Sequence, residues 1–155
     1  MALTADIITT KYGPGGPPNN QPLKANSTVY RGSVAATRSG YLVAMSTPQS
    51  TDVVWGIIDE AVGVANTGPG ITGASTDGGV TVNIDTGSFF LASGTSGDAI
   101  TQANVGQTCW LIDEKTVGAT NPGGNTRPIA GVVEFIDPTY GVAVKLGSSQ
   151  SSGAP

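Results

Sequence analysis

The apolar runs of this chain are short, and their shortness constrains the fold more than any other feature of the sequence. They are rich in Val, Ile and aromatic residues, are separated by Gly, Asn and Asp, and show hardly any i, i+3, i+4 periodicity. Such runs are typical of strands. The sequence therefore predicts an all-β fold, a small β-barrel or β-sandwich of about ten short strands with an extended N-terminal arm. The candidate strands span residues 29–32, 41–44, 53–58, 61–65, 80–84, 88–92, 108–112, 116–119, 129–136 and 141–146.

A stretch rich in proline and glycine, GPGGPPNNQP, precedes these runs at residues 13–22. Its four prolines and three glycines favour an extended linker over a helix or a central strand. We therefore divide the chain into an extended arm with its linker (residues 1–28), a β-domain (29–146) and a flexible C-terminal tail (147–155).

The arm carries four apolar residues, Leu3, Ile7, Ile8 and Tyr12. A free terminus has no need for such a set unless it docks on another surface. Because the linker is too rich in Pro and Gly to fold back readily, we expect the arm to bind another subunit by adding a strand to a sheet edge. Its removal should then leave the stability of the β-domain nearly unchanged.

Composition and charge exclude several classes of partner. The net charge is −4 and the Lys and Arg residues are scattered, so no basic stripe is available for nucleic acid. Neither an apolar window of membrane-spanning length nor a secretory signal is present, which predicts a soluble protein made in a cytoplasm, with no membrane partner. Only 12% of the residues are charged, so much of the surface is neutral and polar, as on proteins that pack against other proteins.

The residues needed for most kinds of catalysis are missing. The chain has no histidine, which excludes His-based triads and imidazole metal sites. Cys109 is the single cysteine and lies in an apolar run, so we expect it to be a buried hydrophobic residue rather than a nucleophile. The GPGG stretch lacks the Lys-Ser/Thr of a phosphate-binding loop. The sequence therefore predicts no metal and no cofactor.

One motif does suggest a reaction, the run VNIDTGSFF at residues 82–90. An apolar residue followed by Asp-Thr-Gly-Ser is typical of aspartic proteases, in which two aspartates share a proton and activate water. A second copy is absent, so Asp85 would require a symmetric homodimer. The alternative interpretation is a strand that ends at Asp-Thr-Gly and resumes as SFFLA.

Three segments share another pattern: GIIDEAVG (56–63), WLIDEKTVG (110–118) and EFIDPTYGV (134–142). Each reads as a strand, an Asp, two turn residues and a return strand. Asp at the first position of a turn accepts a hydrogen bond from the backbone two residues on. Asp113 and Glu114 are therefore interpreted as a hairpin tip rather than as a catalytic pair.

The order and spacing of the later strands resemble the small capsid decoration, or cement, proteins of tailed bacteriophages. The resemblance rests on the runs GVTVNIDTGSFFLAS, GDAITQANVGQTCWLIDEKTVGAT and RPIAGVVEFIDPTYGVAVKL, and it covers about residues 29–146. The matching elements are Gly87 to Leu91, Ala99 to Thr101, Gly106 to Asp113, Ala130 to Val133 and Gly141 to Val144.

The resemblance implies a structural virion protein without catalysis. Such a protein is made in the host cytoplasm, binds the major capsid protein on the outer surface of the phage head as a homotrimer, and stabilises the capsid lattice. Leu3, Ile7, Ile8 and Tyr12 would form its capsid-contact arm. Two alternatives stay open: a homodimeric aspartic protease that uses Asp85, and another phage structural protein such as a head fibre.

Overall fold

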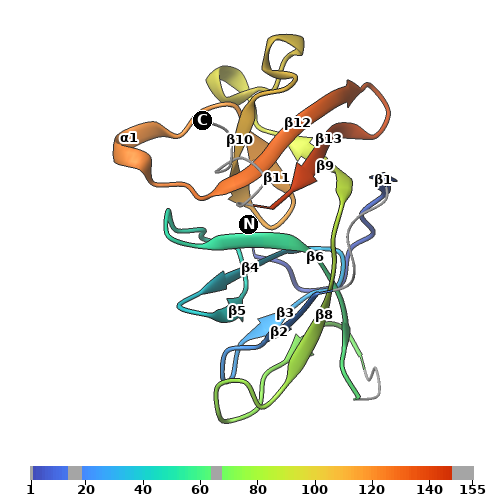
Figure 1. Cartoon of the computed structure of the whole chain (residues 1–155), viewed down its shortest axis with the longest axis vertical. Coiled ribbons are helices and arrows are strands. Elements are labelled where there is room, and N and C mark those ends of the chain that lie inside the picture. Colours follow the sequence, from blue (N-terminus) through green and yellow to red (C-terminus); the bar gives the residue numbers. More distant parts are fainter. Residues whose placement is uncertain (1, 14–18, 64–67, 148–155) are drawn as a thin grey trace.

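The computed structural model of the chain describes residues 2–13, 19–63 and 68–147 (Figure 1). Strands dominate these residues and their helical pieces are single turns, so the all-β prediction is confirmed. The strands are β1 (Lys11–Gly13), β2 (Asn19–Pro22), β3 (Thr28–Val29), β4 (Val34–Arg38), β5 (Tyr41–Val43), β6 (Val53–Ala61), β7 (Ile71–Thr72), β8 (Thr81–Asp85), β9 (Ser88–Ser93), β10 (Thr108–Asp113), β11 (Thr116–Gly118), β12 (Ile129–Asp137) and β13 (Gly141–Leu146). The helical turns are η1 (Ser96–Asp98), η2 (Gln102–Asn104) and α1 (Pro122–Asn125).

The strands of the C-terminal half close into a barrel, here called the C-terminal barrel. Within a six-stranded sheet they follow the order β9-β11-β10-β12-β13, and β13 pairs again with β9 to close the ring. The β9 and β11 pair is parallel, whereas the other pairs are antiparallel. The remaining strand of the sheet, β1, pairs with the early part of β9. Phe89, Leu91, Cys109 and Leu111 are among the residues buried in the core, which confirms the predicted burial of Cys109.

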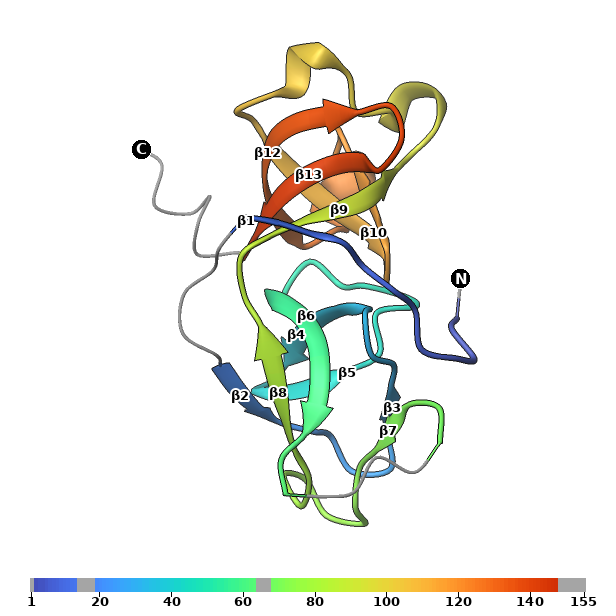
Figure 2. The same ribbon diagram turned by 90° about the vertical axis from the view of Figure 1, so that its right-hand side faces the viewer.

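The strands of the N-terminal half form a second barrel, the N-terminal barrel (Figure 2). Its sheet has the order β2-β8-β6-β4-β5. A parallel bridge between Leu23, which follows β2, and Leu42 in β5 closes it, and Lys24 N donates a hydrogen bond to Leu42 O over 3.0 Å. Leu23, Leu42, Val82 and Ile84 are buried in its core, and β3 and β7 pair separately. Because β2 and Leu23 precede residue 29, the barrel begins inside the segment predicted to be arm and linker.

The two barrels have the same topology. In each, the first strand in the sequence pairs in parallel with the third. Antiparallel pairs then join the third strand to the second, the second to the fourth, the fourth to the fifth and the fifth to the first. The correspondence is β2 with β9, β4 with β10, β5 with β11, β6 with β12 and β8 with β13. The described chain is thus built from two copies of one barrel topology.

Equivalent backbone hydrogen bonds precede the second strand of each copy. Gly32 N donates to Ile58 O over 2.9 Å in the N-terminal barrel, and Gly106 N donates to Val133 O over 2.7 Å in the C-terminal barrel. The carbonyl oxygen of the residue after each glycine accepts a second hydrogen bond, from Ile58 N in the N-terminal barrel and from Val133 N in the C-terminal barrel. Both glycines have a positive φ, 85° and 83°, a conformation that glycine adopts without strain. The correspondence therefore extends to single turns.

A second pair of glycines lies at equivalent positions, and at both of them close packing against the neighbouring strand leaves no room for a side chain. A Cβ atom on Gly56 would lie 2.2 Å from the carbonyl oxygen of Asp85, and one on Gly131 would lie 2.0 Å from that of Lys145. In both barrels the glycine lies in the fourth strand and the carbonyl in the fifth. A side chain cannot fit at either place, so the close approach of these strands requires glycine.

The barrels meet where one end of the C-terminal barrel rests on the outer face of β4 and β6 (Figure 1). Val34 and Ala36 of β4 and Val54 and Ile57 of β6 belong to the same buried cluster as the core of the C-terminal barrel. Val34 N also donates to the carbonyl oxygen of Glu114, at the tip of the β10–β11 hairpin, over 2.8 Å. One apolar core therefore runs from the junction into the C-terminal barrel.

Two details of the strand prediction are wrong. The segment GIIDEAVG forms no hairpin, because β6 continues through Asp59 and its pairing with β8 merely shifts register between Ile58 and Ala61. The residues that were expected to form a turn form a β-bulge within the strand instead. Strand β4 was missed because two of the five residues in its sequence, VAATR, are alanines of low strand propensity, which break up the apolar run. The tail beyond Gly147 lies outside the described residues.

Candidate functional site: the N-terminal strap and the aromatic patch

Residues 2–13 form a strap that runs from the N-terminal barrel to the C-terminal barrel (Figure 2). Asp6 fastens it to the N-terminal barrel. The Asp6 carboxylate accepts hydrogen bonds from the amides of Arg31 and Gly70 over 2.9 and 3.0 Å, and from the Arg31 guanidinium over 3.0 Å. Burial opposes ionisation of Asp6, but these donors outweigh it and lower the pKa of the carboxyl. Ile7 N donates to Arg31 O over 2.8 Å. The strap is therefore held by several polar contacts at this point.

The other end of the strap joins the C-terminal barrel. Strand β1 pairs with β9, and Phe90 N donates to Thr10 O over 2.9 Å. Lys11 Nζ also lies 2.7 Å from Oδ1 of Asp85, which ends β8 of the N-terminal barrel. The expectation that the Pro- and Gly-rich linker keeps the arm from folding back is therefore wrong for the described part of the arm. The physical reason is that the early part of β9 is not covered by β11, and the strap satisfies the backbone groups exposed there.

The predicted contact residues do not form one apolar face. Leu3 and Ile7 are half-buried against the chain itself, and Leu3 N donates to Glu114 Oε1 over 3.0 Å. Ile8 is 98% exposed. Tyr12 lies in β1, and its side chain is outside the part that the structure describes. Of the three whose side chains are described, Ile8 alone is available to a partner.

An aromatic patch covers the outer face of the C-terminal barrel beside the strap. It consists of Phe90, Phe135 and Tyr140, with ring centroids 5.6 Å apart for Phe90 and Phe135 and 5.4 Å apart for Phe90 and Tyr140. Ala143 pairs with both phenylalanines in the strand register and is fully buried beneath them. Tyr140 is 59% exposed. The patch was not predicted, because its residues come from β9, β12 and the β12–β13 turn, and only the folded barrel brings these together.

The N-terminal barrel carries no such rings at the matching register positions of its first and last strands. Asn20 and Asn83 face each other there, where the C-terminal barrel pairs Phe90 with Ala143. The same topology therefore folds with asparagine in place of Phe90. The topology itself does not require an aromatic residue at this position, and the patch is a property of one copy.

The geometry around Asp85 fits the structural interpretation of the IDTGS motif. Asp85 ends β8, its side chain is 44% exposed, and it forms the ion pair with Lys11. A catalytic aspartate pair shares a proton in a shielded site, whereas this carboxylate is matched by a cation. Burial raises the pKa of the neighbouring Asp59 carboxyl, and the charges of Glu60 and Asp85 add to that effect.

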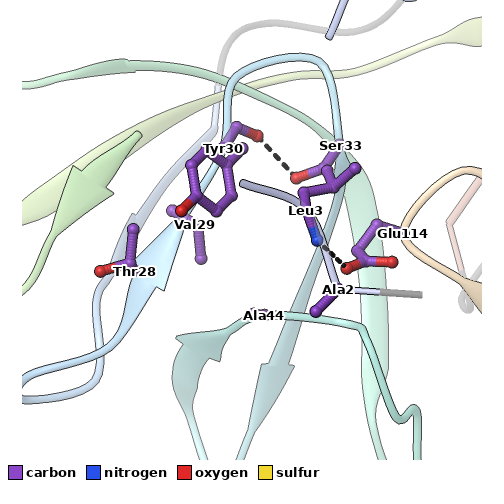
Figure 3. Close-up of a pocket in the computed structure, with 8 residues that line it drawn as sticks. All are labelled: Ala2, Leu3, Thr28, Val29, Tyr30, Ser33, Ala44 and Glu114. Carbon is purple, nitrogen blue, oxygen red and sulfur yellow. Dashed lines mark hydrogen bonds between the residues drawn. The ribbon is translucent and has the colours of Figure 1, made fainter. Parts of the chain in front are cut away.

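The hairpin interpretation of Asp113 is confirmed, but Glu114 has a role that the sequence did not reveal. Asp113 Oδ1 accepts a hydrogen bond from Lys115 N over 3.0 Å, as expected for an Asp-initiated turn. Asp137 does the same at the β12–β13 turn. Glu114, by contrast, is buried at the junction of the barrels beside a cavity (Figure 3).

Other candidate sites are few. Burial raises the pKa of the Cys109 thiol to about 12, so the reactive thiolate is scarce at neutral pH. Within the described ranges, no three acidic or cysteine side chains gather in a way that could hold a metal ion, and no helix is long and apolar enough to cross a membrane. Comparison with known protein families, with curated proteins and with solved structures finds no match for this chain.

Proposed function

We propose that this chain is a structural virion protein, a cement protein that binds the major capsid protein on the outer surface of a tailed-phage head. It acts without catalysis, as a homotrimer, and stabilises the capsid lattice by bridging neighbouring subunits. The strand order that resembles phage decoration proteins supports this assignment. The contact surface is revised from a free arm to the aromatic patch together with the exposed Ile8 of the strap.

The aromatic patch is the observation that carries the proposal. Tyr140 is exposed and the two phenylalanines are half-buried; aromatic residues at a surface are enriched at protein interfaces, where Tyr and Phe supply large rigid contact areas. The two barrels provide an internal comparison: Phe90 stands where the other copy has Asn20. An aromatic residue at a position where the same topology accepts asparagine supports a role in contacting a partner.

The strap contributes in a different way from the arm that the sequence suggested. Because Asp6 and β1 fix its two ends, Ile8 is presented on an ordered segment. A pre-ordered contact avoids much of the conformational entropy, about 1–2 kcal/mol per residue, that a free arm would lose on binding. A trimer then multiplies modest single contacts, and avidity gains of roughly 10²–10⁴ are expected when all sites engage.

Binding to phage heads that lack the protein tests the proposal. The variant Phe90→Asn copies the residue of the N-terminal barrel, and Asn20→Ser serves as the matched control on the equivalent face. We expect Phe90→Asn to weaken co-sedimentation with expanded heads at least tenfold, while Asn20→Ser binds like the wild type. Thermal melting of both variants checks that the fold is intact.

Two outcomes would contradict the proposal in different ways. Wild-type protein that fails to co-sediment with any capsid surface removes the cement assignment itself. Undiminished binding by Phe90→Asn keeps the assignment and removes the aromatic patch as its contact. Sedimentation equilibrium of the free protein, and counting of the copies on each head, test the homotrimer.

A further inference from the structure

A cavity of 210 Å³ lies at the junction of the two barrels, under the start of the strap (Figure 3). The strap, the N-terminal barrel and the β10–β11 tip all contribute to its wall. The main lining residues are Leu3, Val29, Tyr30, Ser33, Ala44 and Glu114. Drug-sized ligands occupy pockets of about 300–1,000 Å³, so this space suits only a few heavy atoms.

The charge of Glu114 is poorly compensated by the described residues. Glu114 is 3% exposed, and its Oε1 accepts one hydrogen bond, from Leu3 N over 3.0 Å. Its Oε2 is buried without a hydrogen-bond partner. Lys11, Lys24, Arg31, Arg38 and Arg127 form ion pairs with other carboxylates, and none of the ion pairs among the described residues involves Glu114. A buried carboxylate with one unsatisfied oxygen is destabilising unless a cation or a further donor reaches it.

The turn does not explain why a glutamate stands here. Asp113 already supplies the side-chain hydrogen bond of the β10–β11 turn. The equivalent turn of the N-terminal barrel uses Ser39 and Gly40, which are both exposed. An apolar residue would pack against the junction without the cost of a buried charge. The carboxylate therefore adds something that neither the hairpin nor the packing requires.

The rest of the wall indicates what would satisfy Oε2. Leu3, Val29 and Ala44 offer aliphatic surface, while the Ser33 hydroxyl already donates to Tyr30 O over 2.6 Å. An anion or a carbonyl-only ligand would repel Glu114 or leave it unsatisfied. A ligand with a cationic hydrogen-bond donor on a short aliphatic stem matches both the charge and the apolar lining.

We propose that this cavity is a binding site for a primary ammonium group on a short aliphatic stem, with Glu114 as its counter-ion. The ammonium comes either from an aliphatic amine, such as a lysine side chain, or from the terminal amino group of a polypeptide chain. Its binding ties the strap, the N-terminal barrel and the β10–β11 tip together. The site is independent of the capsid contact proposed above.

Titration with n-butylammonium chloride tests the site, with n-butanol as the uncharged analogue of the same shape. The variant Glu114→Gln keeps a side-chain acceptor for Leu3 N but removes the charge, and Glu134→Gln makes the same change at an exposed position of β12. We expect n-butylammonium to raise the melting temperature of the wild type and of Glu134→Gln and to shift the NMR signal of the Leu3 amide. Glu114→Gln should bind it at least tenfold more weakly, and n-butanol should have no effect.

A parallel titration after selective acetylation of α-amino groups distinguishes the two sources. Binding that appears only after this treatment identifies a chain-terminal amino group as the resident ligand, and binding in both samples identifies an aliphatic amine. Both results support the site. Equal responses of wild type and Glu114→Gln, equal effects of n-butanol, or no response in either sample would overturn it. The Leu3 amide shift of the wild type decides the matter if Glu114→Gln fails to fold.

Discussion

The N-terminal barrel closes one of its ends with its own polar side chains, whereas the C-terminal barrel leaves the equivalent end to its neighbour. In the N-terminal barrel, Trp55 Nε1 donates to Thr37 Oγ1 over 2.9 Å. Arg38 and the buried Asp52 form an ion pair beside them, with Arg38 Nε 2.8 Å from Asp52 Oδ1. This end therefore satisfies its polar groups without any other part of the chain.

The C-terminal barrel has Leu111 and Ala130 at the positions equivalent to Thr37 and Trp55. Both are buried in the cluster that also contains the outer face of β4 and β6. If this apolar barrel end were exposed to water, the fold would lose roughly 25 cal/mol of stabilisation for each Å² of apolar surface left uncovered. The comparison teaches that one topology can be closed in two ways, and that only the N-terminal copy carries its own closure.

The largest expected effect comes from placing a charge on the face that closes the C-terminal barrel. Ile57 is buried at the junction, and Val132 is its half-buried equivalent on β12. We expect Ile57→Asp to lower the free energy of unfolding by about 3–5 kcal/mol, because the carboxylate is buried without a partner. Val132→Asp, the matched control, should cost only about 1 kcal/mol. Urea unfolding followed by tryptophan fluorescence measures both.

Similar losses for the two variants would show that the β4–β6 face is not the cover that the C-terminal barrel depends on. A loss confined to Ile57→Asp would sharpen the comparison, since the two substitutions are chemically identical and their positions correspond in the duplicated topology.

Substituting the two equivalent glycines, Gly56 and Gly131, should cause a smaller loss of stability, of similar size in both barrels. Gly56→Ala and Gly131→Ala each bring a methyl group into a backbone carbonyl, so each should cost about 1–3 kcal/mol. Gly97, which has open space around its Cα, provides the control, and Gly97→Ala should be nearly neutral. Chemical denaturation of the three variants gives the comparison. If one of the paired glycines accepts alanine without loss, the two barrels are not equivalent at this strand crossing.

The strands and turns that depend on local chemistry could be predicted from the sequence. Val-rich and aromatic runs indicated β8 to β13, and aspartate at the start of a turn indicated the hairpins at Asp113 and Asp137. The same local rule failed at Asp59, because pairing with β8 continues past it and converts the expected turn into a bulge. Local patterns are thus reliable only where no neighbouring strand competes for the same backbone.

The duplication and the candidate contact surface were beyond the reach of such patterns. Apart from two pairs of equivalent glycines, the two copies share register and hydrogen bonds rather than residues: Trp55 corresponds to Ala130, and Asn20 to Phe90. The strap was missed because its anchor is one carboxylate, Asp6, whose partners lie far along the chain. The buried position of Glu114 depends on the contact between barrels, which no local sequence pattern encodes.

The smallest expected effect concerns Cys109, whose equivalent in the N-terminal barrel is Ala35. Both residues are fully buried and both pair with the glycine of the fourth strand. Because the topology already folds with alanine at this position, Cys109→Ala should remove only the packing of one sulfur atom, at a cost of about 1 kcal/mol. Thermal melting of the variant beside the wild type measures it. A loss above about 3 kcal/mol would mean that the C-terminal barrel relies on the sulfur in a way that the N-terminal barrel does not, and the two cores would then differ in packing as well as in how their ends are closed.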